Sequence, residues 1–262
     1  MNQDRCNICS SHSYKKYLDF HDQKKEIVMC NSCKTFRSRP YLLTDYTDQG
    51  LYCEHYLKNE DKFKMFSEDI MNLVVKHKKE GRLLDVGCSI GLLLEEAKRL
   101  GFKAEGIELN KKASEICLSK GLTVKSGMLK DVLNPGESFD VIILNHVLEH
   151  IVELNGFIED IKDFVAEKGI VVIGVPNHNS LVARLYKARW YGWGNGEHVW
   201  HFDRGSFGNL LSNNGFKIKE IIQNSQYYPF SKSFHKNTMA TIAQLGNILG
   251  LGDQLLAVVK KI

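Results

Sequence analysis

The chain has 262 residues, which is enough for one α/β domain of ordinary size and a small appendage. Its formal net charge of +4 at pH 7 comes without a polybasic run, which argues against nucleic acid as a partner but suits an acidic substrate. No apolar run of about 18 residues occurs and the first residues lack a signal-peptide core, so we expect a cytoplasmic protein without a membrane span.

Two CxxC pairs dominate the first 40 residues: Cys6 with Cys9, and Cys30 with Cys33. Two residues between thiolates let both sulfurs reach one ion, and two such pairs complete the tetrahedral sulfur set that zinc prefers. The segment is too small and polar for a core of its own, so metal binding would supply most of its folding energy. The pattern predicts a structural zinc ribbon over residues 1–40, with a redox pair or an iron site as the alternative.

A tyrosine-rich connector with little helical pattern follows the second pair. From Glu60 to Glu80 apolar residues recur at helical spacing, and Gly81 would end the helix; they are Phe63, Phe66, Ile70, Leu73 and Val74. Residues 41–80 are therefore predicted to form a connector and an amphipathic helix that packs against the C-terminal part of the chain.

After Gly81 short apolar runs alternate with helical stretches, which predicts a mainly parallel sheet covered on both faces. We expect strands at about 82–87, 103–108, 122–126, 139–144 and 169–175, and helices at about 91–100, 110–120 and 154–167. The tail predicts a helix near 206–214, a strand near 216–223, a helical stretch near 238–249 and a last strand at 254–260. Residues 81–262 would thus form one α/β domain.

The first of these strands runs into the segment from Asp85 to Gly91, which contains Gly87, Cys88 and Ser89. Glycines between a strand and a helix let the backbone approach a ligand closely, and an acid such as Glu108 at the end of the next strand can accept both hydroxyls of a ribose. Asp85 stands before the first glycine and no lysine follows, so the turn suits a positively charged nucleoside better than a phosphate. An ordinary buried turn of an α/β protein is the alternative.

Polar residues are densest after the fourth predicted strand, where Asn145, His146, Glu149 and His150 occur within six positions. Ligands of an open α/β sheet lie beyond the carboxyl ends of the strands, so these side chains would face the reacting groups. Part of their role could instead be to order the following loop.

A second polar cluster, residues 192–202, lies between the fifth predicted strand and the next helix. Its glycines and aromatics are typical of a loop that covers a ligand. We favour His198 over His201 as the residue that faces the site, because one of the two would pack beneath the loop.

These segments together resemble the class I S-adenosylmethionine (SAM) methyltransferases, on the motif Leu83 to Gly91 and on Phe139-Asp140-Val141-Ile142 followed by Val147-Leu148-Glu149-His150-Ile151. The resemblance implies SAM as cofactor and a Rossmann-like seven-stranded sheet whose last strand is antiparallel. It also implies that Asp85 faces the methionine end of SAM, and it places in the cofactor site Gly87, Cys88, Ser89, Gly91, Glu108, Leu109, Met128, Leu129 and Asn145.

The chain departs from this family at Met128, where the family commonly has an acid for the adenine amino group. Met128 and Leu129 would then enclose the adenine ring and offer backbone groups, with Asp131 as a further candidate. Tyr52 and Tyr56 of the connector could close over the methionine end or pack the ribbon against the main domain.

The order of ribbon, tyrosine-rich connector and SAM fold resembles bacterial methyltransferases that modify sugars, in particular the N-terminal two thirds of deoxysugar C-methyltransferases. Their further C-terminal domain has no counterpart here, so we expect a small-molecule or glycan-type acceptor, such as a building block of a cell-envelope polysaccharide. A base is needed when the nucleophile is a hydroxyl or a carbon acid, and the candidates are His150 and His198, with Glu149 and His146 beside them.

Two alternatives stay open. One is a metal-assisted O-methyltransferase of the quinone or RNA type; such enzymes carry a glutamate where this chain has His146, a change that lowers affinity for a hard cation. The other is a non-catalytic binding protein that uses the zinc ribbon and the SAM fold. The acceptor atom and the oligomeric state do not follow from these residues.

Overall fold

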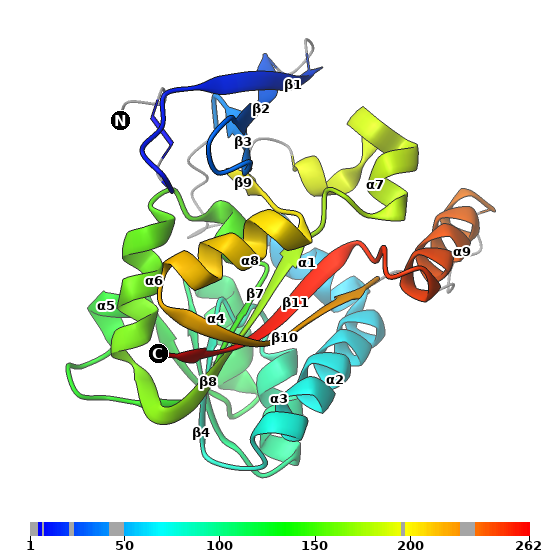
Figure 1. The fold of residues 1–262 in the computed structure, drawn as a ribbon. Coiled ribbons are helices and arrows are strands. Elements are labelled where there is room, and N and C mark those ends of the chain that lie inside the picture. The colour runs from blue at the N-terminus through cyan, green and yellow to red at the C-terminus, as the bar shows by residue number, and fades with distance from the viewer. Residues whose placement is uncertain (1–4, 7, 21–23, 42–49, 195–196, 226–233) are drawn as a thin grey trace.

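The computed structural model describes residues 5–6, 8–20, 24–41, 50–194, 197–225 and 234–262, without the side chains of 50–52 and 234–237. The described residues form two β-sheets, a large one covered by helices and a small one above it (Figure 1). No helix within these ranges is long and apolar enough to cross a membrane.

The large sheet has seven strands in the order β10-β11-β8-β7-β4-β5-β6. Their bounds are β4 Arg82–Val86, β5 Lys103–Glu108, β6 Thr123–Ser126, β7 Phe139–Asn145, β8 Val165–Pro176, β10 Phe216–Asn224 and β11 Gln254–Lys261. Strands β8, β7, β4, β5 and β6 pair in parallel, whereas β11 is antiparallel to both β8 and β10. This confirms the predicted α/β fold with its antiparallel last strand.

Successive residues of a strand face opposite sides, so neighbouring leucines of β4 serve two different cores. Leu83 lies in a cluster with helices α2 (Glu60–His77) and α3 (Leu92–Arg99). Leu84 lies in a second cluster with α5 (Leu129–Val132), α6 (Leu154–Asp163) and α8 (Arg204–Asn213). The remaining helices are α1 Gly50–Lys58, α4 Lys111–Ser119, α7 Leu181–Tyr186 and α9 Phe234–Ile248, with single 3₁₀ turns at Leu148–His150, Lys187–Arg189 and Tyr191–Trp193.

Two local expectations were wrong. The connector, expected to be poor in helix, contains α1, whose Cys53 packs against Ile90 and Leu92 beside the glycine turn. The helix expected at 154–167 ends at Asp163, and β8 begins at Val165 because Val165 pairs with Phe139 ahead of a register shift. Tertiary pairing has overridden the helical propensity of the residues after Val165.

The small sheet consists of β1 (Tyr14–Phe20), β2 (Lys25–Cys30), β3 (Phe36–Arg39) and β9 (Trp200–His201), all paired antiparallel. Figure 1 shows the three N-terminal strands in blue with the yellow β9 beneath them. The sheet is therefore completed by residues far outside the segment 1–40. The division of the chain at residues 40 and 80 stays a prediction.

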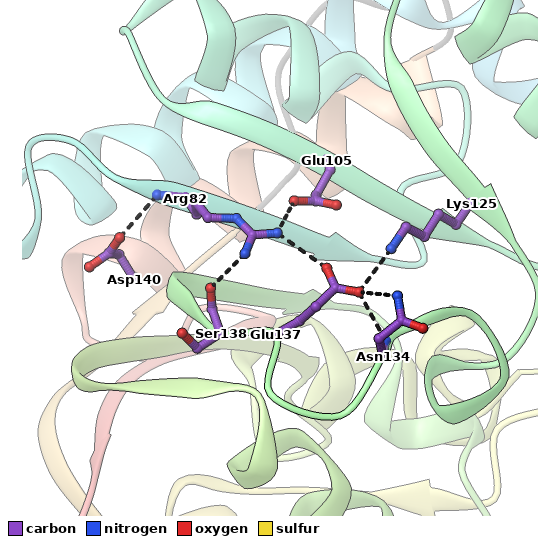
Figure 2. A network of polar contacts seen from close by, with 7 residues as sticks. All are labelled: Arg82, Glu105, Lys125, Asn134, Glu137, Ser138 and Asp140. Atoms are coloured by element: carbon purple, nitrogen blue, oxygen red, sulfur yellow. Dashed lines mark hydrogen bonds and ion pairs between the residues drawn. The ribbon is translucent and has the colours of Figure 1, made fainter.

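A polar network centred on Arg82 joins four strands of the large sheet (Figure 2). The Arg82 guanidinium lies 2.7 Å from Glu105 and 3.3 Å from Glu137, and its backbone N–H donates to Asp140 at 3.0 Å. Glu137 also accepts from Lys125 at 3.2 Å and from the backbone N–H of Asn134 at 2.9 Å. Arg82 and Asp140 lie at the amino-terminal ends of β4 and β7, away from the carboxyl ends where a ligand would bind. Lys125 lies in the carboxyl-terminal half of β6 and joins the network through its contact with Glu137.

Candidate active site

The turn between β4 and α3 is held close to β5. The backbone N–H groups of Gly87 and Cys88 both donate to the carbonyl of Ile107, at 2.8 and 3.1 Å. Gly87 and Gly91 have φ of +78° and +82°, a region that favours glycine. Ser89 adopts φ +51° without being glycine, a strained conformation of the kind often found at functional sites.

Two buried acids lie behind this turn. Asp85 is 4% exposed on β4, and burial followed by the charge of Glu108 raises its pKa to about 7. Glu108 ends β5 and accepts from the backbone N–H groups of Ser89 and Asn110, at 2.7 and 2.8 Å. Burial also raises the pKa of Glu108, against the lowering effect of those hydrogen bonds. Among the described residues neither acid has a buried Lys or Arg as a partner, and two such carboxylates suit a ligand that carries positive charge.

A pocket opens between the glycine turn and helix α2, and it holds about 560 Å³ of space free of atoms, counting solvent at its mouth. Six predicted cofactor or catalytic residues line it: Asp85, Gly87, Cys88, Ser89, Asn145 and His146. Five predicted cofactor residues do not: Gly91, Glu108, Leu109, Met128 and Leu129. Met128 is 48% exposed and Leu129 is buried, and their contact with the adenine ring stays a prediction.

Aromatic side chains form the wall of the pocket opposite the turn. Tyr56 stacks on Phe63 with ring centroids 4.2 Å apart, and Phe66 meets Phe63 edge to face at 5.9 Å. The sequence predicts Phe63 and Phe66 only as packing residues of the amphipathic helix, because a helical stripe carries no signal that its apolar face meets a ligand. The side chain of Tyr52 lies outside the described residues.

His146 connects the pocket to Glu149. Its Nδ1 lies 3.0 Å from Glu149 Oε1, and the amide Nε2 of Gln254 lies 3.4 Å from its Nε2 and 2.8 Å from Asn145 Oδ1. Because an amide nitrogen only donates, His146 accepts at Nε2 and donates from Nδ1 to the carboxylate. His146 has φ +57°, so a strained backbone presents this ring. Gln254 opens the last strand, and nothing in the local sequence pointed to it.

Glu149, His150 and His198 converge, with one potential ligand atom from each lying within 4.8 Å of the others. Nδ1 of His150 donates to the carbonyl of Glu197 at 3.1 Å, and Nδ1 of His198 donates to that of Gly192 at 2.9 Å. Since a carbonyl only accepts, each neutral ring keeps its Nε2 unprotonated. Glu149 Oε2 is buried without a hydrogen-bond partner among the described residues.

Protonation in this cluster follows from burial and charge. Burial, the largest effect, lowers the pKa of His198, so its imidazole is neutral at pH 7. For Glu149 burial acts upward, but the hydrogen bond from His146 and the neighbouring histidines lower its pKa to about 2. The cluster therefore sets an ionised carboxylate beside a neutral base.

His201, the residue we disfavoured, packs beneath the loop. It is 3% exposed, its Nε2 lies 3.0 Å from Ser38 Oγ, and its ring meets Trp193 edge to face. Burial lowers its pKa well below the ordinary value.

The four N-terminal cysteines lie together, with all Sγ atoms within 4.8 Å of one another. Cys6 and Cys33 are 3.7 Å apart and Cys9 and Cys30 are 3.5 Å apart, close to the ~3.7 Å expected between thiolates bound tetrahedrally at ~2.3 Å from one zinc. The contact with Cys33 lowers the pKa of Cys6 to about 4. These residues fit a zinc ion.

Comparisons with known proteins identify methyltransferases as similar proteins. A curated relative, the ubiquinone biosynthesis O-methyltransferase of Rhodopseudomonas palustris strain BisA53, is 30% identical over 132 residues, which are 45% of this chain and 51% of that protein. The chain thus spans about half the length of the curated relatives it matches.

Solved structures share the fold at low identity. A SAM-dependent methyltransferase from Archaeoglobus fulgidus has a TM-score of 0.58 at 18% identity, covering 79% of this chain and 99% of its own. The plantazolicin methyltransferase BpumL in complex with SAH has a TM-score of 0.56 at 17% identity, covering 79% of this chain and 87% of its own.

The sequence profile of a methyltransferase-domain family matches residues 57–221, which is more than half of the chain and includes α2, the glycine turn and the Glu149 cluster. Together with the seven-stranded sheet and the pocket at its carboxyl edge, this match places the protein in the class I SAM-dependent methyltransferases.

Proposed function

We propose that the chain transfers a methyl group from SAM to a hydroxyl group of a small acceptor of the quinone or phenol type. The observation that carries this proposal is that His150 and His198, whose Nδ1 atoms both donate to backbone carbonyls, converge on Glu149, next to His146 of the pocket. A base so placed suits a hydroxyl nucleophile. The names of the curated relatives favour this reading over the sugar or polysaccharide acceptor expected first.

When bound, SAM supplies an electrophilic methyl group on a sulfonium. Asp85 and Glu108 would hold its charged and ribose ends, and Asn145 and His146 would face the donor end from β7. His198 or His150 would take the hydroxyl proton at Nε2, and the ionised Glu149 would stabilise the resulting imidazolium. Beyond supplying a base, the protein would accelerate methyl transfer by positioning, because an in-line displacement needs the methyl donor and the acceptor aligned with each other.

The test is methyl transfer from labelled SAM to a panel of hydroxylated benzoates, sugar nucleotides and amines. We expect transfer to a catechol such as 3,4-dihydroxybenzoate, a loss of at least about 100-fold in kcat for His198→Ala or His150→Ala, and an unchanged dissociation constant for S-adenosylhomocysteine (SAH). Lys187→Ala, an exposed residue of the same region, is the matched control. Transfer only to sugars or amines would refute the acceptor class. Failure of the wild type to bind SAH would favour the non-catalytic alternative.

A metal-assisted form of this reaction is the second candidate, because one specific observation favours it. Glu149 Oε2 is buried without a partner among the described residues, and Glu149 lies beside the imidazoles of His150 and His198, each of which donates from Nδ1 to a backbone carbonyl. Two imidazoles and one carboxylate suit Zn²⁺, Fe²⁺ or Mn²⁺ better than Mg²⁺. Metal analysis of wild type and Glu149→Gln decides: a second bound metal that Glu149→Gln loses supports it, and a single metal in both proteins refutes it.

We also propose that Cys6, Cys9, Cys30 and Cys33 bind one structural zinc ion. The thiol distances support a closed tetrahedral site, in which four protein ligands leave no open position for catalysis. Metal analysis should give one zinc per chain, and a chelator should make the segment 1–40 sensitive to protease. Protease resistance of the metal-free segment would contradict the assignment.

A further inference from the structure

The small sheet and the loop of His198 form one hydrogen-bonded unit. Strand β3 pairs with β9 in the register Phe36 with His201 and Arg37 with Trp200, and the backbone N–H of Ser38 donates to the carbonyl of Val199 at 2.9 Å. The backbone that carries His198 is therefore the edge of the sheet built by the N-terminal segment.

Ser38 reaches the two histidines of the loop with its side chain. Its Oγ is buried, donates to the carbonyl of His198 at 2.7 Å and lies 3.0 Å from Nε2 of His201. One hydroxyl has one proton to donate, so Ser38 accepts from His201 while it holds the carbonyl of His198. This side chain holds the backbone at His198 and contacts the ring packed beneath it.

Lys25 of β2 fastens the other end of the same loop. Lys25 is 5% exposed, and its ammonium donates to the carbonyls of Trp193 and Gly194, both at 2.8 Å. His198 in turn donates to the carbonyl of Gly192. The small sheet thus holds the loop on both sides of His198, the candidate base.

The cysteines close the hairpin that carries these contacts. Cys30 ends β2, the N–H of Lys34 donates to its carbonyl at 3.0 Å, and its own N–H donates to the carbonyl of Thr35 at 3.0 Å. Strand β3 begins after Thr35, and within it Ser38 pairs with Ile27 of β2. Metal bound at Cys30 and Cys33 would hold the turn that aligns Ser38 with Lys25.

We propose that Ser38 is a positioning residue for His198, and that the four-cysteine segment acts through it as part of the acceptor site. Metal occupancy then controls acceptor turnover and leaves cofactor affinity alone, since no described residue before Tyr56 lines the cofactor pocket. The proposal rests on the proposed function for the role of His198.

The first test compares Ser38→Ala, Ser38→Thr and Ser13→Ala in the full chain. Ser13 is exposed and its Oγ accepts from Asn31 in the same region, which makes it a matched control. We expect Ser38→Ala to lose about tenfold or more in kcat with a catechol acceptor, at unchanged zinc content and SAH affinity. Ser38→Thr, which keeps the hydroxyl, should recover most of the loss.

The second test uses tryptophan emission, because all three tryptophans of the chain, Trp190, Trp193 and Trp200, flank or lie in this loop and are at most 3% exposed. Removing the zinc with a chelator should shift their emission to longer wavelength and abolish turnover, while SAH binds as before. Ser38→Ala should give a smaller shift in the same direction, and Ser13→Ala none.

The outcomes separate this proposal from the proposed function. If wild type methylates the catechol and both Ser38→Ala and the metal-free protein turn over as fast, the positioning role is wrong. If the emission shifts occur but no hydroxyl acceptor is methylated, the loop coupling stands and the proposed acceptor class fails.

Discussion

We expect Asp85 to couple SAM binding to pH. Its pKa is raised to about 7 by burial and by Glu108, so a large share of the carboxyl groups is protonated at neutral pH in the ligand-free protein. SAM carries a net positive charge, which favours the ionised form. Binding should therefore release a proton below pH 7, and affinity should rise as the pH approaches 7 and then level off.

Calorimetry of SAM binding between pH 5.5 and 8, in buffers of different ionisation enthalpy, measures that proton. Asp85→Asn should bind about 10-fold or more weakly, and without pH dependence or proton release. Glu115→Gln, an exposed acid of α4, should behave as wild type. The same raised pKa means that the folded ligand-free state binds more protons than the unfolded state between pH 3.8 and 7, so this group's contribution to stability falls as pH rises across that window. If the SAM affinity of the wild type does not change between pH 5.5 and 8, the proposed role of Asp85 is wrong.

The strands of the large sheet were predictable as elements because each is an apolar run between turn residues. Strands such as β5 and β7 match the expected ranges within one residue. Elements that depend on a distant partner were not predictable: β9 has two residues and exists only because β3 lies beside it. Helix α1 was missed because its sequence is weakly amphipathic and its role is to cover the glycine turn.

The turn that starts α3 needs glycine at position 91 for two reasons: the positive φ of Gly91, and the lack of space for a Cβ there. Gly91 and Gly101 both have positive φ, +82° and +92°, but a Cβ at Gly91 would collide with Leu122 and lie 2.9 Å from Cys117 Sγ, whereas a Cβ at Gly101 meets nothing within 4 Å. Gly101→Ala should lower the free energy of unfolding by about 1 kcal/mol, and Gly91→Ala by about 3 kcal/mol. Urea denaturation without ligand measures the free energy of unfolding of both variants. Equal losses in the two variants would show that the turn has room for a Cβ at position 91. Only Gly91→Ala should also weaken SAH binding.

The Arg82 network should stabilise the sheet without affecting the site (Figure 2). Hydrogen bonds from Asn134, then Lys125 and Arg82, hold the pKa of Glu137 at about 2 despite some burial. A carboxyl with a lowered pKa contributes stability above its ordinary pKa and loses it as pH falls toward 2. Glu137→Gln should lower the free energy of unfolding by about 1 kcal/mol at pH 7, and this difference from wild type should shrink below pH 4.

Glu159→Gln is the control for that network. Glu159 pairs with Lys162 on the surface of α6, with its side chain 60% exposed, so its loss should change stability by less than about 0.5 kcal/mol at any pH. Both variants should bind SAH as wild type does, and weaker binding by Glu137→Gln would mean that the two ends of the strands are coupled.

At the scale of the whole molecule, the predicted seven-stranded fold is confirmed, but the contacts that connect its parts were not visible in the sequence. Asp85, the glycine turn and the Glu149 segment follow strands of one parallel sheet, so their meeting at one edge could be predicted. Gln254, Ser38 and Lys25 reach the candidate site from opposite ends of the chain through side-chain hydrogen bonds, which leave no periodic pattern.

Cofactor and zinc should therefore stabilise different parts of the molecule. The pocket residues come from α1, α2, β4, α3, the turn between β4 and α3, and the end of β7, whereas the cysteines hold β2 and β3. SAH at 100 times its dissociation constant should add about 2.7 kcal/mol to the free energy of unfolding. Denaturation with and without SAH should give this same increment in zinc-loaded and zinc-free protein, although the zinc-free protein is less stable in both cases. Asp85→Asn should reduce the increment in both. If the increment differs between zinc-loaded and zinc-free wild type, the loop of His198 and the cofactor pocket unfold as one cooperative unit. The proposal that zinc affects acceptor turnover but not cofactor affinity would then be wrong.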